Sequence, residues 1–259
     1  MKSLKNFSYL LVLILGISLT SCDDLQICEQ GEGPVVVQTL NIDPMTGFRL
    51  DVSAEVFISE GATQSVEVHA QQNIIDLLET DVQNDIWDID IPGCVNTDEE
   101  IEIYITLPKL EYAKIAGSGD VVGQTSFTTD DLELDISGSG YIELDVDAQS
   151  VSTKISGSGD VVLDLDTDDL ISRITGSGKL TYAGTATTHD SRSSGSGKLF
   201  AYDLITDESL IRINGSGDAE VYADQTLDVN IAGSGNVSFK GNAALEVNIT
   251  GSGKVIDAN

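Results

Sequence analysis

Apolar and polar residues alternate strictly along most of the chain, as in the run Ile-Glu-Leu-Asp-Val-Asp over residues 142–147. A period of two with many β-branched residues is typical of half-buried β-strands, and the repeat region lacks the 3.6-residue period of a helix. The tripeptide Gly-Ser-Gly punctuates this alternation, with copies that begin at Gly117, Gly138, Gly157, Gly176, Gly195, Gly215, Gly233 and Gly251. Successive copies begin 18 to 21 residues apart. This spacing predicts a solenoid whose repeats pack on their neighbours.

Two apolar columns accompany the tripeptide. The residue two before the first glycine is isoleucine in every copy except one, where Ser193 replaces it, and the residue four after that glycine is always apolar. Glycine reaches positive φ without steric penalty, so Gly-Ser-Gly predicts a corner at which successive rungs stack about 4.8 Å apart. We therefore predict an all-β, single-stranded parallel β-helix with rungs of about 19 residues. A leucine-rich repeat has a similar period, but its signature is absent.

The repeat, well represented by Ile-Arg-Ile-Asn-Gly-Ser-Gly-Asp at 211–218, resembles the bacterial GIN domain family. That family is described as the head of autotransporter adhesins and is a domain of unknown function. Segments 47–52 and 72–78 resemble its first half, so the likeness covers about residues 34–257. The resemblance implies a right-handed parallel β-helix on the outside of a Gram-negative cell envelope. It implies no established activity.

The first 21 residues have the sequence features of a signal peptide. Lys2 and Lys5 precede an apolar run from residue 7 to residue 19, which is too short for a membrane span. The run ends in Leu-Thr-Ser-Cys, which resembles a lipobox in which Cys22 is diacylated. The alternative is an ordinary signal peptide with an incidental cysteine. We expect a lipoprotein, because the length, the order and the cysteine all agree.

Two aspartates follow Cys22 directly. In enteric-type sorting, Asp at this place resembles an inner-membrane retention signal, whereas in other Gram-negative lineages it resembles a surface-export signal. The family resemblance favours an outer-membrane lipoprotein of the cell envelope, either surface-exposed or facing the periplasm.

The mature chain is long enough for one sizeable domain. We predict a tether over 22–33 and a β-helix over 34–259 of about 12 rungs, with Gly-Ser-Gly rungs from 113 to 259 and a less regular N-terminal part. A short helix is predicted over 73–80, where apolar residues cluster without alternation. A separate N-terminal domain is the lesser alternative.

Cys28 and Cys94 are the remaining cysteines. In an oxidising envelope compartment an isolated pair of cysteines predicts a disulfide, which would tie the tether to the first rungs. Two buried free thiols are the alternative.

The charge of the chain excludes one class of partner. Without Lys2 and Lys5, 11 basic residues face 43 acidic ones, a formal charge of −32 that excludes nucleic acid. Membrane contact must then come through the lipid anchor. Glu143, Asp145 and Asp147 fall at the same repeat offsets as Val162, Asp164 and Asp166, so carboxylates should stack about 5 Å apart. Calcium accepts such oxygen-rich sites, so calcium binding by these rows stays a hypothesis, although the calcium-binding nonapeptide is absent. We assign no metal-ligating residues and predict no cofactor.

Five of the 11 basic residues share one column, three positions before the first glycine: Lys114, Lys154, Arg173, Arg192 and Arg212. The same column holds Asp135, Asn230 and Asn248. The simpler interpretation is a stripe of weak surface ion pairs. The sharper hypothesis is a binding strip for an anionic glycan or for the acidic surface of a partner protein.

No catalytic motif is evident. His69 and His189 lie far apart in sequence, Trp87 is the only tryptophan, and eight copies of Gly-Ser-Gly indicate turns rather than nucleophiles. The irregular segment 185–194 predicts a bulge rather than a site. We predict a non-catalytic binding or adhesion module. The alternatives are a polysaccharide-active β-helix enzyme and a structural component of envelope assembly, which would oligomerise.

Overall fold

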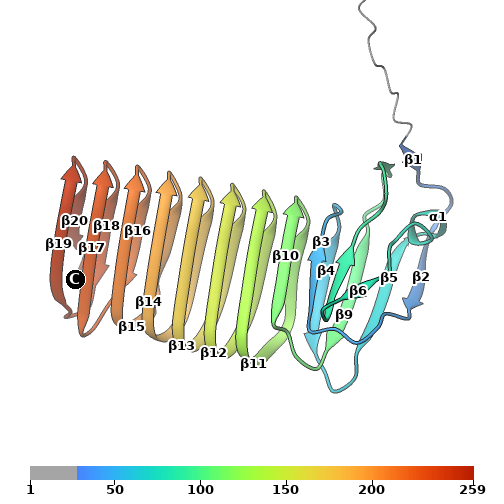
Figure 1. Cartoon of the computed structure of the whole chain (residues 1–259), viewed down its shortest axis with the longest axis horizontal. Helices are drawn as coiled ribbons and strands as arrows, with labels where there is room; N and C mark the ends of the chain where they lie inside the picture. The colour runs from blue at the N-terminus through green and yellow to red at the C-terminus, as the bar shows by residue number, and fades with distance from the viewer. Residues whose placement is uncertain (1–27) are drawn as a thin grey trace, which may run out of the picture.

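The structure, a computed structural model, describes residues 28–259. Figure 1 shows a rod in which a regular stack of rungs runs to the C-terminus and a less regular group of strands forms the other end. The predicted signal peptide and Cys22 lie outside the described residues. Within residues 28–259, no helix is both long enough and apolar enough to cross a membrane.

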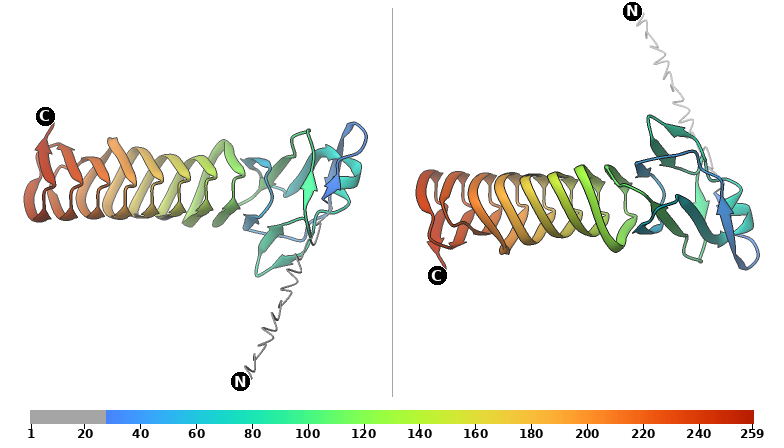
Figure 2. Two further views of the ribbon diagram at one scale, coloured as in Figure 1. Left: turned by 90° about the horizontal axis from the view of Figure 1, so that it is seen from above. Right: turned by 90° about the horizontal axis from the view of Figure 1, so that it is seen from below.

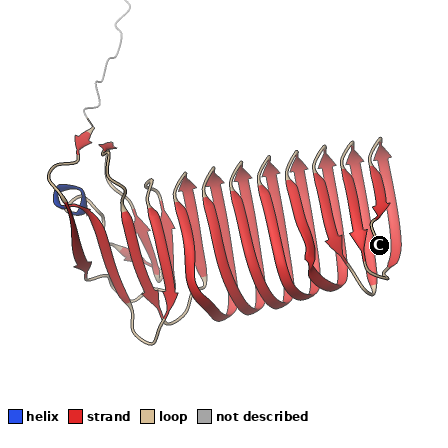
Figure 3. Ribbon diagram, turned by 180° about the vertical axis from the view of Figure 1, so that it is seen from behind, coloured by secondary structure: helices blue, strands red, loops and turns tan. Residues whose placement is uncertain are grey.

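The stack is a parallel β-solenoid of about eight turns, which confirms the predicted fold class and the rungs of about 19 residues. Each strand pairs in parallel with the strand one turn away, as Figures 1 and 3 show. The strands are β10 (Tyr112–Gly117), β11 (Asp120–Gly138), β12 (Tyr141–Gly157), β13 (Asp160–Gly176), β14 (Lys179–Gly195), β15 (Lys198–Gly215), β16 (Asp218–Tyr222), β17 (Thr226–Gly233), β18 (Asn236–Lys240), β19 (Ala244–Gly251) and β20 (Lys254–Asp257). The expectation of about 12 rungs was too high, because the N-terminal third holds fewer full turns.

Each rung is one turn of the solenoid and has two sides. In β12, residues 141–148 pair with β13 up to a second corner at Gln149, and residues 150–157 pair with β13 beyond it. We call the half-rung that follows Gly-Ser-Gly the leading side and the half-rung that precedes the next Gly-Ser-Gly the trailing side. Alternate residues on both sides point into a shared core, and the others reach solvent. Figure 2 shows the stacked turns from above and below.

The two glycines of a corner have different roles, which Gly157 and Gly159 illustrate. Gly157 has φ +138°, and a Cβ there would lie 2.3 Å from the carbonyl oxygen of Gly138 in the preceding rung. The Ser158 backbone N–H donates to that same oxygen at 2.8 Å. A Cβ on Gly159 would lie 2.6 Å from Cγ2 of Ile136, the column isoleucine of the preceding rung. The first glycine therefore permits the backbone turn, and the second leaves room for isoleucine.

Unequal spacing between corners appears as bulges. The longest interval, 21 residues, coincides with a register shift between Val122 and Ser126, where β11 pairs with β12. The interval of 20 residues coincides with a shift between Thr181 and Ala183, where β14 pairs with β15. The prediction of a bulge within 185–194 is wrong, because that segment pairs with β13 without a break in register.

The N-terminal strands continue the solenoid and then close it. β3 and β7 extend the trailing side beyond β10, and β4 and β9 extend the leading side beyond β11. Beyond them, β5 and β2 pair antiparallel. The strands are β1 (Glu29–Gln30), β2 (Val35–Leu40), β3 (Gly47–Leu50), β4 (Glu55–Glu60), β5 (Ser65–Gln71), β6 (Val82–Gln83), β7 (Ile86–Ile89), β8 (Val95–Asn96) and β9 (Glu102–Leu107).

A short helix, α1 (Gln72–Ile75), lies at this end of the core (Figure 1). Ile74 and Ile75 are buried, and the predicted helix over 73–80 is shorter than expected because Leu77 and Leu78 donate to carbonyls only three residues back. The core residues of β7 and β9, Trp87 among them, are at most 1% exposed. The N-terminal end of the solenoid is therefore covered.

Candidate functional site: a basic column on an acidic rod

Strand register places the predicted basic residues in one column on the trailing side. Lys114 is opposite Asp135, and Asp135 is opposite Lys154. Next in the column come Arg173, Arg192 and Arg212, one rung apart, and then Asn230 and Asn248. We call the run Lys154, Arg173, Arg192 and Arg212 the basic column. Four cations thus stand about 4.8 Å apart in backbone spacing, along the axis of the rod.

The first part of the predicted strip is partly neutralised by Asp135. Its side chain is 7% exposed, and its Oδ2 lies 3.1 Å from Nζ of Lys154 and 3.6 Å from Nζ of Lys114. One buried carboxylate therefore serves two ammonium groups. Lys114 belongs to this pairing and lies beyond Asp135 from the arginines, so it is separated from the rest of the predicted strip.

The arginines keep excess positive charge. Asp190 accepts from Arg192 at 2.8 Å and from Arg212 at 3.3 Å, and hydrogen bonding to Asp190 raises the pKa of Arg192. Arg173 is exposed and makes no ion pair with any residue in 28–259. Two of the three arginines thus share one carboxylate, and the third has none. Stacking like charges at this spacing is unfavourable, and an incoming anion would relieve it.

Small polar side chains border the basic column. The neighbouring outward column, two residues closer to the corner, holds Ser156, Thr175, Ser194 and Asn214. A shallow hollow of about 340 Å³ lies beside Arg192 and Arg212 and extends to Asn230 and Asn248. The surface therefore offers charged donors flanked by hydroxyl and amide groups along a straight line.

The predicted acidic rows lie on the leading side. Asp145 is opposite Asp164, and Asp147 is opposite Asp166, as the repeat offsets require. Thr185 donates to Asp166 at 2.7 Å, which partly satisfies that row. Among residues 28–259, no group of three or more His, Cys, Asp or Glu is arranged to hold a metal ion.

A larger hollow, about 660 Å³, lies where the N-terminal strands meet the first regular rung. Its acidic lining includes Asp51, Glu55, Asp90 and Asp120, together with the run 98–100. Burial raises the pKa of Glu55, and the nearby Glu100, Asp120 and Glu102 raise it further. Sequence reasoning missed this hollow, because it is built from loops about 40 residues apart and only the acidic run 98–100 hinted at it.

The two histidines are not brought together. His189 points into the core from β14, where its Nε2 lies 3.0 Å from Ser172 Oγ, and Tyr182 also contacts that hydroxyl. Burial lowers the pKa of His189 to about 4 and raises that of Tyr182 to about 12. His69 lies on β5 between Glu67 and Glu102, with ring nitrogen to carboxylate distances of 2.7 and 3.4 Å. Neither histidine stands in a cleft with a matched acid and nucleophile.

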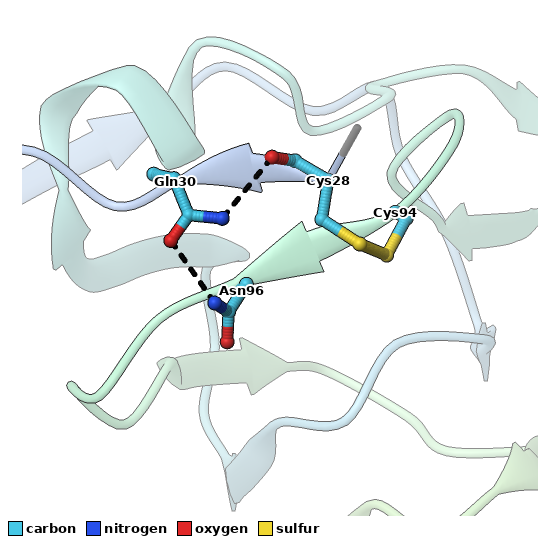
Figure 4. The surroundings of a disulfide bond; sticks show 4 residues. All are labelled: Cys28, Gln30, Cys94 and Asn96. Carbon is cyan, nitrogen blue, oxygen red and sulfur yellow. Dashed lines mark hydrogen bonds between the residues drawn. A yellow bond between two sulfur atoms is a disulfide. The ribbon is translucent and has the colours of Figure 1, made fainter. Parts of the chain in front are cut away.

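Cys28 and Cys94 form a disulfide, with Cα atoms 4.4 Å apart and a sequence separation of 66 (Figure 4). It joins β1 to β8, which pair in parallel. Gln30 bridges the two strands, since it donates to the Cys28 carbonyl at 3.2 Å and accepts from Asn96 at 3.0 Å. The end of the predicted tether is therefore fastened to the N-terminal strands.

Comparison with known proteins places this architecture in a family. No curated protein matches the chain. Among solved structures, a putative adhesin from Parabacteroides merdae is 22% identical with a TM-score of 0.83, over 88% of this chain and 98% of that one. A putative adhesin from Parabacteroides distasonis is 24% identical with a TM-score of 0.84, over 88% and 98%. A putative lipid binding protein from the same organism is 24% identical with a TM-score of 0.82, over 88% and 99%.

These likenesses establish a common fold. The model of one family, "Putative auto-transporter adhesin, head GIN domain", matches residues 46–164 and 151–243, which is most of the chain. Its description indicates a binding module of the cell surface or envelope. The chain belongs to the GIN domain family.

Proposed function

We propose that this protein is a non-catalytic adhesion module, held at the outer membrane by a lipid on Cys22, and that its basic column binds an anionic glycan. The observation that carries the proposal is the uninterrupted run Arg173, Arg192 and Arg212 on a chain that is otherwise strongly acidic. Asp190 pairs with only the last two of these arginines. Such a local reversal of charge selects an anionic ligand and repels cationic ones.

The shape of the strip favours a linear polymer. The cations lie in a straight row along the rod, with hydroxyl and amide side chains beside them at Thr175, Ser194 and Asn214. An extended acidic polysaccharide carries charges and hydroxyl groups at regular intervals, so it would contact several rungs together. Each exposed contact is weak, and affinity would come from their number.

The placement of the titratable groups supports a role without catalysis. General acid–base chemistry needs a side chain that reaches the substrate and titrates near the working pH. His189 is 2% exposed with a pKa of about 4, and the carboxylates beside the basic column, Asp135 and Asp190, are engaged in ion pairs with its lysine and arginines. A ligand on this strip would meet cations and hydrogen-bond donors, which hold an anion without cleaving it.

The proposed anchor suits the geometry of the rod. β1, which directly follows Cys28, lies at the covered end, and the C-terminus lies at the far end of the stack (Figure 1). A lipid on Cys22, six residues before Cys28, would hold the covered end near the membrane and leave the basic column and the last rungs further out. Several acyl chains on one cysteine make a durable anchor.

Glycan binding is tested with a panel of acidic and neutral polysaccharides and with analysis of products. The test variant is Arg173→Gln/Arg192→Gln, and the matched control is Lys179→Gln/Lys198→Gln, which removes two positive charges from the leading side. We expect retention of an acidic polysaccharide that weakens with salt, is lost in the arginine variant and survives in the lysine variant. Equal binding by both variants would overturn the proposed site. New reducing or unsaturated ends would establish an enzyme instead.

Anchoring is tested by protease treatment of intact cells and by mass spectrometry of the mature N-terminus. We expect acylated Cys22, loss of the protein on shaving, and release of a Cys22→Ser variant from the membrane fraction. Unmodified Cys22 would overturn the anchor. Protection from protease would place the binding surface in the periplasm.

A further inference from the structure

The last rung of the solenoid exposes apolar residues in columns that the preceding rung buries. On β19, the inward positions Leu245, Val247 and Ile249 are 44%, 41% and 38% exposed. The residues one rung earlier in the same columns, Leu227, Val229 and Ile231, are at most 2% exposed. The difference arises because no further strand of residues 28–259 stacks on β19.

The backbone of β19 is equally open. It pairs with β17 along one edge, and no strand in the described part of the chain pairs with the other edge. Natural sheets usually protect such edges with lysine, proline, a bulge or a short strand. β19 has eight residues, and Glu246 is its single charge. Figure 1 shows the contrast with the opposite end of the rod, where α1 and the antiparallel strands close the core.

We propose that β19 is a homotypic docking surface, and that two copies of this chain join tail to tail by antiparallel pairing of their β19 strands. In head-to-tail stacking, β19 would meet the end of the core that α1 closes, where the exposed apolar residues, Val35 and Val37 of β2, alternate with the residues of β2 that pack on the core. A tail-to-tail contact uses the same surface on both copies, so it closes as a two-fold dimer and does not grow into a filament.

In the register that we propose, the sequence of β19 is self-complementary. With the two-fold axis at Val247, Leu245 lies opposite the partner's Ile249, and the two Val247 side chains meet. The outward residues then place Glu246 opposite the partner's Asn248, a carboxylate against an amide. A register centred on Glu246 would instead oppose two carboxylates, which is destabilising.

Charge also selects this arrangement. Residues 242–259 carry only Glu246, Lys254 and Asp257, whereas the whole chain has a formal charge of −30. Two such acidic rods repel least when they meet end to end, because their charged sides then stay furthest apart. Repulsion should still oppose the contact, so higher salt should strengthen the dimer.

This pairing would give the rod a role in adhesion between cells, a consequence that rests on the proposed membrane anchor. The two N-terminal ends would lie at opposite ends of a rod of double length. Copies anchored on two cells could therefore join across the gap between them.

Dimerisation is tested in solution, separately from anchoring and glycan binding. Residues 28–259 contain the whole described core and the disulfide, and sedimentation velocity of this chain at low and high salt measures its mass. We expect twice the monomer mass for the wild type, and monomers for Val247→Asp. Asn230→Asp, which adds the same charge one rung inside the stack, should stay dimeric.

A second set of variants keeps the proposal testable if Val247→Asp unfolds the last rung. Asn248 faces outward, and in the proposed register Asn248→Lys would oppose the partner's Glu246. We expect Asn248→Lys to lower the dissociation constant about tenfold at low salt, and Asn248→Glu to raise it by a similar factor. Asn230→Lys should leave it unchanged. A wild-type monomer at high concentration, a dimer that survives Val247→Asp, or equal effects of Asn248→Lys and Asn230→Lys would overturn the proposal.

Discussion

Replacing Gly157 by alanine should damage the solenoid more than any change of similar size on its surface. Gly157 has φ +138°, a region that residues with a Cβ rarely enter. The new Cβ would also stand 2.3 Å from the carbonyl oxygen of Gly138 and 3.1 Å from the carbon of that carbonyl. Both atoms are backbone, so a side-chain movement cannot relieve the contact.

The loss of stability follows from the backbone strain and from the close contact of the new Cβ. Strain in this part of φ space costs about 1–3 kcal/mol. Relieving the close contact requires the corners to move apart, which breaks the hydrogen bond from the Ser158 N–H to the Gly138 carbonyl at 2.8 Å. Loss of such a bond costs about 1 kcal/mol, with some loss of packing in addition. We expect a total destabilisation of about 3–5 kcal/mol.

Calorimetry of residues 28–259 measures this effect against the matched control Ser158→Ala. Ser158 is the exposed middle residue of the same corner, and its side chain makes no hydrogen bond to residues 28–259. A domain of this size loses about 2–4 °C in melting temperature for each kcal/mol, so Gly157→Ala should melt about 6–20 °C lower. The Ser158→Ala variant should melt within about 2 °C of the wild type. Equal melting temperatures for the two variants would refute the steric account of the corner.

Three further predictions concern stability. Ser193→Ile should stabilise the protein by about 2–3 kcal/mol, measured by denaturant unfolding, because it completes the isoleucine column and removes the buried, unpartnered Ser193 Oγ. The control Ser194→Ile, on the exposed side, should not stabilise the protein. His189 has a folded pKa of about 4, and the unfolded chain binds its proton first, near pH 6.5. Stability should therefore fall by about 3 kcal/mol from pH 6.5 to pH 4 relative to His189→Leu. Cys94→Ser should lower stability by about 4 kcal/mol in the chain-entropy model, and reductant should affect the wild type alone.

The regular rungs were predictable because their rules are local. The corners repeat at nearly constant spacing, so residues at equal offsets from Gly-Ser-Gly must stack. The basic column and the Asp145–Asp164 pair therefore lie at the positions that their offsets from Gly-Ser-Gly predict. Departures from the mean spacing even predict extra residues, which appear as register shifts in β11 and β15. Their positions within the rung were not predictable, because both neighbouring strands continue the same alternation.

The N-terminal part lacks such punctuation. Strand alternation there identified strands but not their partners, so the antiparallel pairing of β2 with β5 and of β5 with β9 had no signal in the sequence. The acidic hollow escaped prediction for a related reason, since its loops converge only after the strands have paired. Likewise, the column position of Asp135 was evident, whereas its burial between two lysines depends on packing.

The basic column and β19 occupy separate parts of one rod, so two kinds of adhesion can be separated by mutation. Arg173→Gln/Arg192→Gln changes side chains on rungs that lie within the stack and leaves the last rung intact. Val247→Asp changes the last rung and leaves those arginines in place. Cells that display the arginine variant should still aggregate through β19 but lose an acidic glycan, and cells that display Val247→Asp should keep the glycan but stop aggregating. If either variant abolished both behaviours, the two surfaces would be coupled, and the rod could not be treated as a rigid support for independent contacts.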